Sequence, residues 1–177
     1  NVEMVTFPDY NHKNENSYNS DLATKNNSLC VDADLIKIEG RSTFEFCDVY
    51  TKNRQMIHVK IYSRSSVLSH LFNQGYVSAN LLLDKEFRDK INDKLSPDYK
   101  IANTSARPNM TIGEYKVIYG IISKSDRSFE IPFFSKLTLM HVGKTLANIG
   151  FGVSVVKIQN IKPDKINDDK KNDNFEN

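Results

Sequence analysis

The stretch FEFCDVYTKNRQMIHVKIYSRSSVLSHLF, residues 44–72, decides the fold of this chain. Phe44–Tyr50 is rich in aromatic residues, which favour strands. Gln55–Tyr62 alternates apolar and polar residues, the pattern of a strand with one buried face. The polar residues 51–54 separate the two segments and predict a hairpin loop. The stretch therefore predicts two antiparallel strands that lead into a helix beginning near Ser65.

Patterns on either side of this stretch predict an α/β fold. The further elements that we expect are a short helix at 17–24, a strand at 34–39, helices at 65–75 and 78–94, a strand at 115–123, a helix at 132–148 and a strand at 152–158. A strand–helix–strand crossover is usually parallel. The expected fold is therefore a mixed sheet with an antiparallel three-stranded unit, then helices and a crossover, in an order similar to the restriction-endonuclease-like architecture.

The composition is that of one folded domain. The 177 residues are 39% hydrophobic and 26% charged, so a chain of this length can bury a core. We expect a polar segment with a short helix at 1–28, a single α/β domain at 29–160 and a disordered polar tail at 161–177. The chain begins at Asn1 rather than Met, and we expect a fragment or a trimmed chain.

Charge and cysteine content narrow the classes of protein. The formal net charge of +2 does not by itself predict a nucleic-acid partner. The sequence has no run of about 18 apolar residues, so we expect no membrane partner. Cys30 and Cys47 cannot form a disulfide framework or a four-cysteine zinc site, and we interpret both as small buried residues. We expect a cytoplasmic protein, and the sequence gives no oligomeric state.

Asp48, His58 and Lys60 form the candidate catalytic set. The i, i+2 spacing of His58 and Lys60 places both side chains on one face of their strand, and Asp48 can face them from the preceding strand. Phosphodiester cleavage needs a carboxylate to hold a divalent cation and a cation to stabilise charge. Asp48 is the expected ligand of Mg²⁺ or Mn²⁺, with Glu15 or Asp21 as a second carboxylate. The same residue types also occur on ordinary solvated sheet faces.

A second set of residues could bind nucleic acid, either DNA or RNA. Arg64, Ser65 and Ser66 lie at the start of the predicted helix, where backbone N–H groups and the helix dipole favour a phosphate. Lys52 and Arg54 add positive charge in the predicted hairpin loop. Plain serine capping and a solvated basic surface explain these residues equally well.

The run FEFCDVYTKNRQMIHVKIYSRSSVLSHLFNQGYVSANLL, residues 44–82, resembles a sporadically distributed bacterial family of unknown function whose genes tend to lie near mobile or anti-phage defence genes. The similar elements are the CD pair at 47–48, IHVK at 57–60, SSxLSHLF at 65–72, QGxVSA at 74–79, E-x-x-YN at 15–19 and PFFSKL at 132–137. The resemblance implies that this chain is either the C-terminal part of a longer protein with a further N-terminal domain or a short relative, and it implies no settled activity.

The order of elements separately suggests a distant similarity to the PD-(D/E)XK nucleases. That pattern needs an Asp, followed by Glu-x-Lys. Asp48 and Lys60 match it, whereas His58 stands in place of the glutamate. Imidazole is a poor ligand for Mg²⁺ and suits Mn²⁺ better. Three functions stay open at this point: a metal-dependent nuclease, a non-catalytic nucleic-acid-binding module, and a protein-interaction domain of the same fold.

Overall fold

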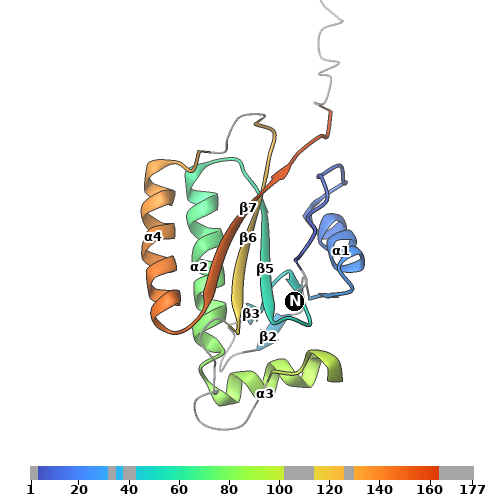
Figure 1. Cartoon of the computed structure of the whole chain (residues 1–177), viewed down its shortest axis with the longest axis vertical. Helices are drawn as coiled ribbons and strands as arrows, with labels where there is room; N and C mark the ends of the chain where they lie inside the picture. Colours follow the sequence, from blue (N-terminus) through green and yellow to red (C-terminus); the bar gives the residue numbers. More distant parts are fainter. Residues whose placement is uncertain (1–3, 32–34, 38–42, 102–113, 126–129, 164–177) are drawn as a thin grey trace, which may run out of the picture.

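A five-stranded mixed sheet forms the centre of the molecule in the computed structural model, which describes residues 4–31, 35–37, 43–101, 114–125 and 130–163 (Figure 1). The elements in chain order are α1 (Glu15–Lys25), β1 (Leu29–Cys30), β2 (Leu35–Lys37), β3 (Thr43–Glu45), β4 (Val49–Tyr50), β5 (Gln55–Ile61), α2 (Ser65–Leu81), α3 (Lys85–Lys94), a 3₁₀ turn (Pro97–Tyr99), β6 (Lys116–Ser123), α4 (Phe133–Asn148) and β7 (Gly152–Gln159). The strand order is β1-β4-β5-β6-β7, and β2 and β3 pair separately.

The sheet combines antiparallel and parallel strand pairing, as the sequence predicts. β1, β4 and β5 pair antiparallel, whereas β5, β6 and β7 pair parallel. α2 and α3 lie between β5 and β6 in the chain, and α4 lies between β6 and β7, so each parallel pair is joined by helical segments. The mixed α/β class is therefore confirmed.

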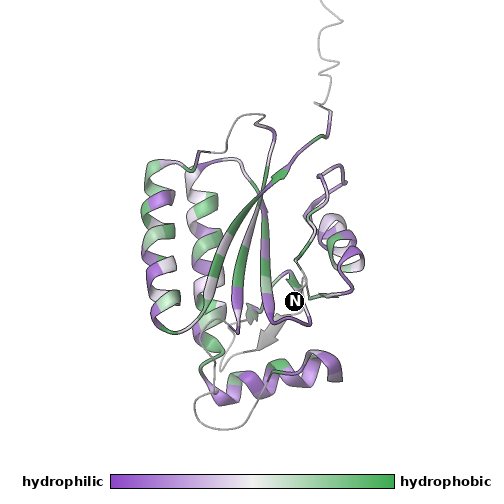
Figure 2. Ribbon diagram, viewed as in Figure 1, coloured by the Kyte–Doolittle hydropathy of each residue, from purple (hydrophilic) through white to green (hydrophobic). Residues whose placement is uncertain are grey.

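Helices cover the two faces of the sheet unequally. α2 and α4 lie on one face and α1 lies on the other (Figure 1). Ile57 and Val59 of β5 pack with Tyr18 and Leu22 of α1. Met56, on the opposite face, belongs to the larger core with residues of α2 and α4. Apolar residues are frequent on the central strands, whereas α3 is mostly hydrophilic (Figure 2).

The predicted strand at Phe44–Tyr50 is wrong as one element. It consists of two short strands, β3 and β4, which belong to different sheets. Phe46 and Cys47 between them are buried, so the chain passes through the core as it changes sheet. The predicted partner strand at 34–39 pairs with β3 rather than with the main sheet, where β1 takes its place instead.

The predicted end of the helix at Gly75 is also wrong, because α2 continues to Leu81. Gly75 allows α2 to pack closely against β6. A Cβ atom at this position would lie 2.6 Å from the ring and hydroxyl of Tyr119 on β6. The Tyr119 hydroxyl donates to the Phe72 carbonyl oxygen at 2.8 Å, so the ring is fixed against α2. Glycine therefore lets the helix approach the sheet closely.

The expectations about the cysteines, membrane helices, the C-terminal tail and the location have different outcomes. Cys47 is buried as expected, but Cys30 is exposed. No helix in the described part of the chain is both long and apolar enough to cross a membrane. Most of the predicted disordered tail, residues 164–177, lies outside the described residues. The cytoplasmic location stays a prediction.

Candidate functional site

The second half of β5 has a strand on only one side. β6 pairs with β5 along residues 55–61, whereas β4 pairs only with Met56 and Ile57. Beyond Ile57, two side-chain carboxylates take the place of a strand. Asp48 Oδ2 accepts from the Val59 N–H at 2.6 Å, and Glu15 Oε1 accepts from the Ile61 N–H at 2.8 Å. The backbone donors at this edge are thus satisfied by acidic side chains.

The local sequence explains how each carboxylate reaches the edge. The Asp48 N–H donates to the Ile57 carbonyl oxygen at 3.0 Å, which continues the ladder by one residue and leaves the Asp48 side chain beside Val59. Glu15 is the first residue of α1, which begins in a capping box made by Asn14 and Ser17. The positive end of the helix dipole stabilises an acidic side chain in this first turn.

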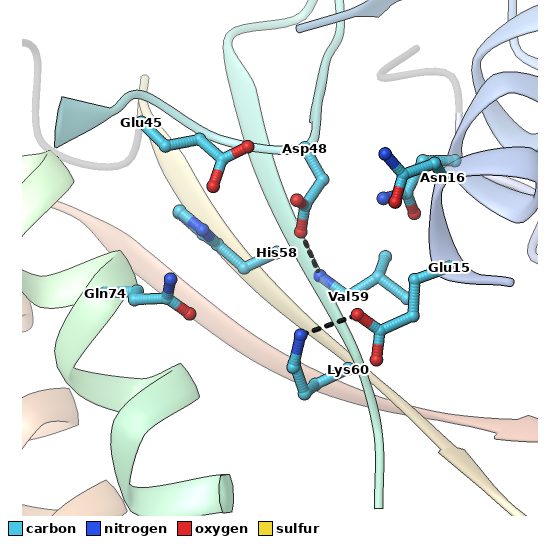
Figure 3. Close-up of a pocket in the computed structure, with 9 residues that line it drawn as sticks. Glu15, Asn16, Glu45, Asp48, His58, Val59, Lys60 and Gln74 are labelled. Atoms are coloured by element: carbon cyan, nitrogen blue, oxygen red, sulfur yellow. Dashed lines mark hydrogen bonds and ion pairs between the residues drawn. The ribbon is translucent and has the colours of Figure 1, made fainter. Parts of the chain in front are cut away.

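A polar pocket of about 150 Å³ lies beside this edge (Figure 3). It is lined from several elements: Glu15, Asn16 and Asn19 of α1, Glu45 of β3, Asp48, Gln74 of α2, and His58, Val59 and Lys60 of β5. Residues from both helical layers reach it because no strand separates the layers at this point. At roughly 30 Å³ for each water, the pocket has room for about five. It can thus hold a hydrated ion or a phosphate group, but not a whole nucleotide.

Lys60 is the one basic side chain among the nine lining residues. Its Nζ lies 2.6 Å from Glu15 Oε2. Partial burial acts to lower the pKa of Lys60, but the hydrogen bond and charge of Glu15, together with Asp48 and Glu45, raise the pKa overall. Lys60 is therefore an ammonium ion in this pocket.

His58 is the most enclosed titratable residue of the site. The residue is 4% exposed, and burial lowers the pKa of its imidazole to about 4. Its ring lies beside the Tyr119 ring, with centroids 6.3 Å apart. Nε2 is buried and has no hydrogen-bond partner. His58 therefore offers the pocket an uncharged imidazole at neutral pH.

The lining side chains have a negative balance. Three carboxylates and one ammonium, with a neutral His58, give a formal charge of −2. An anion such as phosphate is disfavoured there unless a cation enters with it. The described residues contain no group of three or more His, Cys, Asp or Glu side chains placed to hold one metal ion. A divalent cation would therefore need water or a substrate phosphate to complete its coordination, as Mg²⁺ commonly does.

The structure brings together most of the predicted catalytic set. Asp48, His58, Lys60 and Glu15 all line the pocket. Asp21 does not line it, and its carboxylate instead lies 3.3 Å from His12 Nε2 and 2.9 Å from Lys25 Nζ. Glu15 is therefore the better of the two alternatives for the second carboxylate.

The predicted nucleic-acid set falls into two separate places. Lys52 and Arg54 precede β5, whereas Arg64 and Ser65 follow it, and seven residues of strand span roughly 23 Å. Lys52 pairs with Asp98 and lies over the ring of Tyr99. Arg54 pairs with Glu114 and lies over the ring of Tyr115. These basic side chains already have carboxylate partners.

The start of α2 serves helix packing. The Ser65 and Ser135 hydroxyl oxygens lie 2.6 Å apart, and the Ser135 hydroxyl donates to the Ser65 carbonyl oxygen at 2.8 Å. These contacts join α2 to α4. Arg64 occupies the N-cap position without a side-chain capping bond, and Ser66 is exposed. Phosphate binding at this helix end stays a prediction.

Sequence reasoning missed four lining residues, Asn16, Asn19, Glu45 and Gln74. Asn19 could have been found from Glu15, because residues i and i+4 of a helix lie on one face, whereas the i+1 spacing of Asn16 gives no such signal. Gln74 lies in the QGxVSA motif of the resemblance, which gave it no role, and its position depends on the continuation of α2 through Gly75. Glu45 had no signal, since its position depends on the unexpected break between β3 and β4.

Comparisons with known proteins give one match. A family model described as a family of unknown function (DUF6119) matches residues 1–159. No curated protein and no solved structure matches the chain. The comparisons therefore support the resemblance to a family of unknown function. They carry no information on a nuclease fold or on neighbouring defence genes.

Proposed function

Because the chain belongs to DUF6119, a family of unknown function, we propose an activity from the pocket alone: a nuclease-like domain that cleaves phosphodiester bonds with a divalent cation. The observation that carries the proposal is the meeting of Asp48, Lys60 and Glu15 in one polar pocket. The substrate is DNA or RNA. The wider setting, a bacterial defence or mobile-element protein, is inferred from the resemblance of residues 44–82 alone.

The lining residues have distinct roles in the proposed reaction. One carboxylate, from Asp48, Glu15 or Glu45, would hold the cation, and the cation would neutralise the negative charge on the scissile phosphate. The Lys60 ammonium stabilises the negative charge that develops on the phosphate. The oxygen of a water forms a bond to phosphorus and the bond to the leaving sugar oxygen breaks. The attacking water gives its proton to solvent, and the leaving oxygen takes one from solvent.

The order of elements also supports the proposal. A helix (α1), three antiparallel strands (β1, β4 and β5), a helix (α2) and a parallel strand (β6) occur in this order, interrupted by the separate pair β2 and β3 and by α3 with its following 3₁₀ turn. This order is similar to the restriction-endonuclease-like core expected from the sequence. The carboxylates and the lysine lie where β4 and β5 stop pairing.

The test is a cleavage assay on DNA and RNA, single- and double-stranded, with Mg²⁺, Mn²⁺ or EDTA. We expect cutting with a divalent cation and none in EDTA. Asp48→Asn removes the charge but keeps an oxygen that can accept from Val59. Both Asp48→Asn and Lys60→Ala should slow cutting by roughly 100-fold or more, because each removes a group that stabilises the transition state.

Two matched controls use the same residue types outside the pocket. Asp21→Asn removes a carboxylate that pairs with His12 and Lys25, and Lys136→Ala removes an exposed lysine on α4. Both variants should cut at the wild-type rate. Absence of cutting on every substrate, or undiminished cutting in both Asp48→Asn and Lys60→Ala, would show the proposal to be wrong.

A further inference from the structure

We infer that His58 is itself a ligand of the cation in this pocket, and that the pocket therefore prefers Mn²⁺ to Mg²⁺. The inference rests on the proposed function, because it requires a divalent cation in the same place. It adds a nitrogen ligand to a site whose other ligands are oxygen atoms. It also gives a chemical role to His58, which stands where the Glu-x-Lys pattern has a glutamate.

The unsatisfied nitrogen of His58 is the first observation. Nε2 is buried and has no hydrogen-bond partner, although the residue is only 4% exposed. Buried polar atoms in folded proteins are nearly always satisfied, and an exception calls for an explanation such as an absent ion. A cation bound to Nε2 would satisfy this atom.

The position of the ring is the second observation. His58 lines the pocket together with Glu45 and Asp48, and Figure 3 shows its ring between Glu45 and Gln74. The ring packs beside Tyr119, whose hydroxyl is engaged by the Phe72 carbonyl oxygen. The imidazole is thus held by the core at the wall of the pocket that Glu45 and Asp48 also line, away from bulk solvent.

The ligand chemistry gives the expected selectivity. Mg²⁺ prefers oxygen ligands and keeps several waters, whereas first-row transition metals accept an imidazole nitrogen readily. His58 with one carboxylate, from Asp48 or Glu45, supplies two protein ligands, and water supplies the others. Two ligands agree with the absence of any group of three placed to hold one ion among the described residues.

The test measures binding of Mn²⁺ to the purified chain without nucleic acid, by the loss of the free-ion electron paramagnetic resonance signal. Wild-type protein should bind Mn²⁺, and Mg²⁺ should compete weakly. His58→Gln should weaken Mn²⁺ binding roughly tenfold or more and leave Mg²⁺ binding unchanged. His58→Glu should shift the preference towards Mg²⁺. His141→Gln, an exposed histidine on α4, is the matched control and should bind as wild type.

A second measurement needs no change at His58, in case its variants fail to fold. Mn²⁺ at low stoichiometry broadens the nuclear magnetic resonance signals of nearby groups. The chain has four histidines, and the signals of the other three can be assigned from His12→Gln, His70→Gln and His141→Gln. The remaining imidazole, His58, should broaden first. Broadening of another histidine before His58 would overturn the inference.

The outcomes separate the inference from the proposed function. Mn²⁺ binding that is unchanged in His58→Gln, or Mg²⁺ binding as tight as Mn²⁺ binding, would overturn the role of His58 even if the protein cuts nucleic acid. Mn²⁺ binding that depends on His58 would support the inference even if no substrate is cut. In that case only the proposed phosphodiester cleavage would be wrong.

Discussion

The two halves of β5 differ in what lies beside them. Residues 55–57 have β6 on one side and β4 or its loop on the other, and they are buried. Residues 58–61 have β6 on one side and the carboxylates of Asp48 and Glu15 on the other. The outer side of the first half of β5 thus contacts a strand and a loop. The outer N–H groups of the second half donate to side-chain carboxylates.

This difference shows how one strand can serve both stability and chemistry. Where a neighbouring strand is present, the backbone groups are satisfied and no space is left beside them. Where carboxylates take its place, the backbone is still satisfied, but charged groups and a pocket lie at the edge. The same carboxylates can therefore be structural, functional or both, and variants that keep the hydrogen bond while removing the charge can distinguish these roles.

The largest expected effect lies in the half of β5 that has a strand on both sides. Ile57 is fully buried against α1, so Ile57→Ala removes apolar contacts and leaves a cavity. We expect the free energy of unfolding to fall by about 2–5 kcal/mol, measured by urea denaturation. A loss below about 1 kcal/mol would mean that this half is packed no better than the other.

His58, at the start of the other half, should make stability depend on pH. Burial lowers the pKa of its imidazole to about 4 from an ordinary value of 6.5. Between these values the unfolded chain binds the proton and the folded chain does not. The contribution is therefore fully present above pH 6.5 and is lost as the pH falls towards 4, by about 3 kcal/mol in total.

The measurement compares wild type with His58→Gln in EDTA, by urea denaturation at several pH values from 7 to 4. The difference between the two proteins should change over this range in the stated direction. Charged or titratable groups near the imidazole are Glu15, Glu45, Asp48, Lys60 and Tyr119. The neighbouring carboxylates are present in both proteins, so the difference between the two isolates the contribution of His58. Parallel pH profiles would contradict the assignment.

Much of β5 could be predicted from the sequence because its signal is local. Alternation of apolar and polar residues assigns Ile57, Val59 and Ile61 to one face and His58 and Lys60 to the other, and the structure confirms this. The matched carboxylate, Asp48, follows from the same local pattern. Helix α4 and strands β6 and β7 were also predicted, because each is a continuous apolar or amphipathic run.

The chain path that brings Asp48 and Glu15 to the second half of β5 could not be predicted, because it depends on distant packing. Phe44–Tyr50 has the composition of one strand, and only burial of Phe46 and Cys47 shows why it divides into β3 and β4. Gly75 has the usual signal of a helix end, but the contact with Tyr119 gives it another role. Propensity describes a segment, whereas these features are set by contacts between segments.

The next largest effect concerns the hydrogen bond between Asp48 and Val59. Asp48→Ala leaves the Val59 N–H without its acceptor at a half-buried edge, so we expect a loss of about 1–3 kcal/mol in the free energy of unfolding. Asp48→Asn keeps an acceptor and should lose less than about 1 kcal/mol. Asp98→Ala, which removes an exposed carboxylate paired with Lys52, is the control and should change stability by no more than about 0.5 kcal/mol. Equal losses in Asp48→Ala and Asp48→Asn would mean that the charge, not the acceptor, stabilises this edge.

The smallest effect should come from the ion pair between Glu15 and Lys60. The two side chains are 23% and 38% exposed, so solvent screens the pair and its coupling should be about 1 kcal/mol or less. The pKa of Lys60 is raised in the folded chain, so this contribution is present below the ordinary value of 10.5 and is lost as the pH rises above it. A double-mutant cycle of Glu15→Gln and Lys60→Met measures the coupling, because the glutamine can still accept from Ile61. High salt should reduce it further. A coupling above about 2 kcal/mol would instead make the pair a main support of this edge, and Lys60 would then be poorly suited to leave Glu15 for a substrate phosphate.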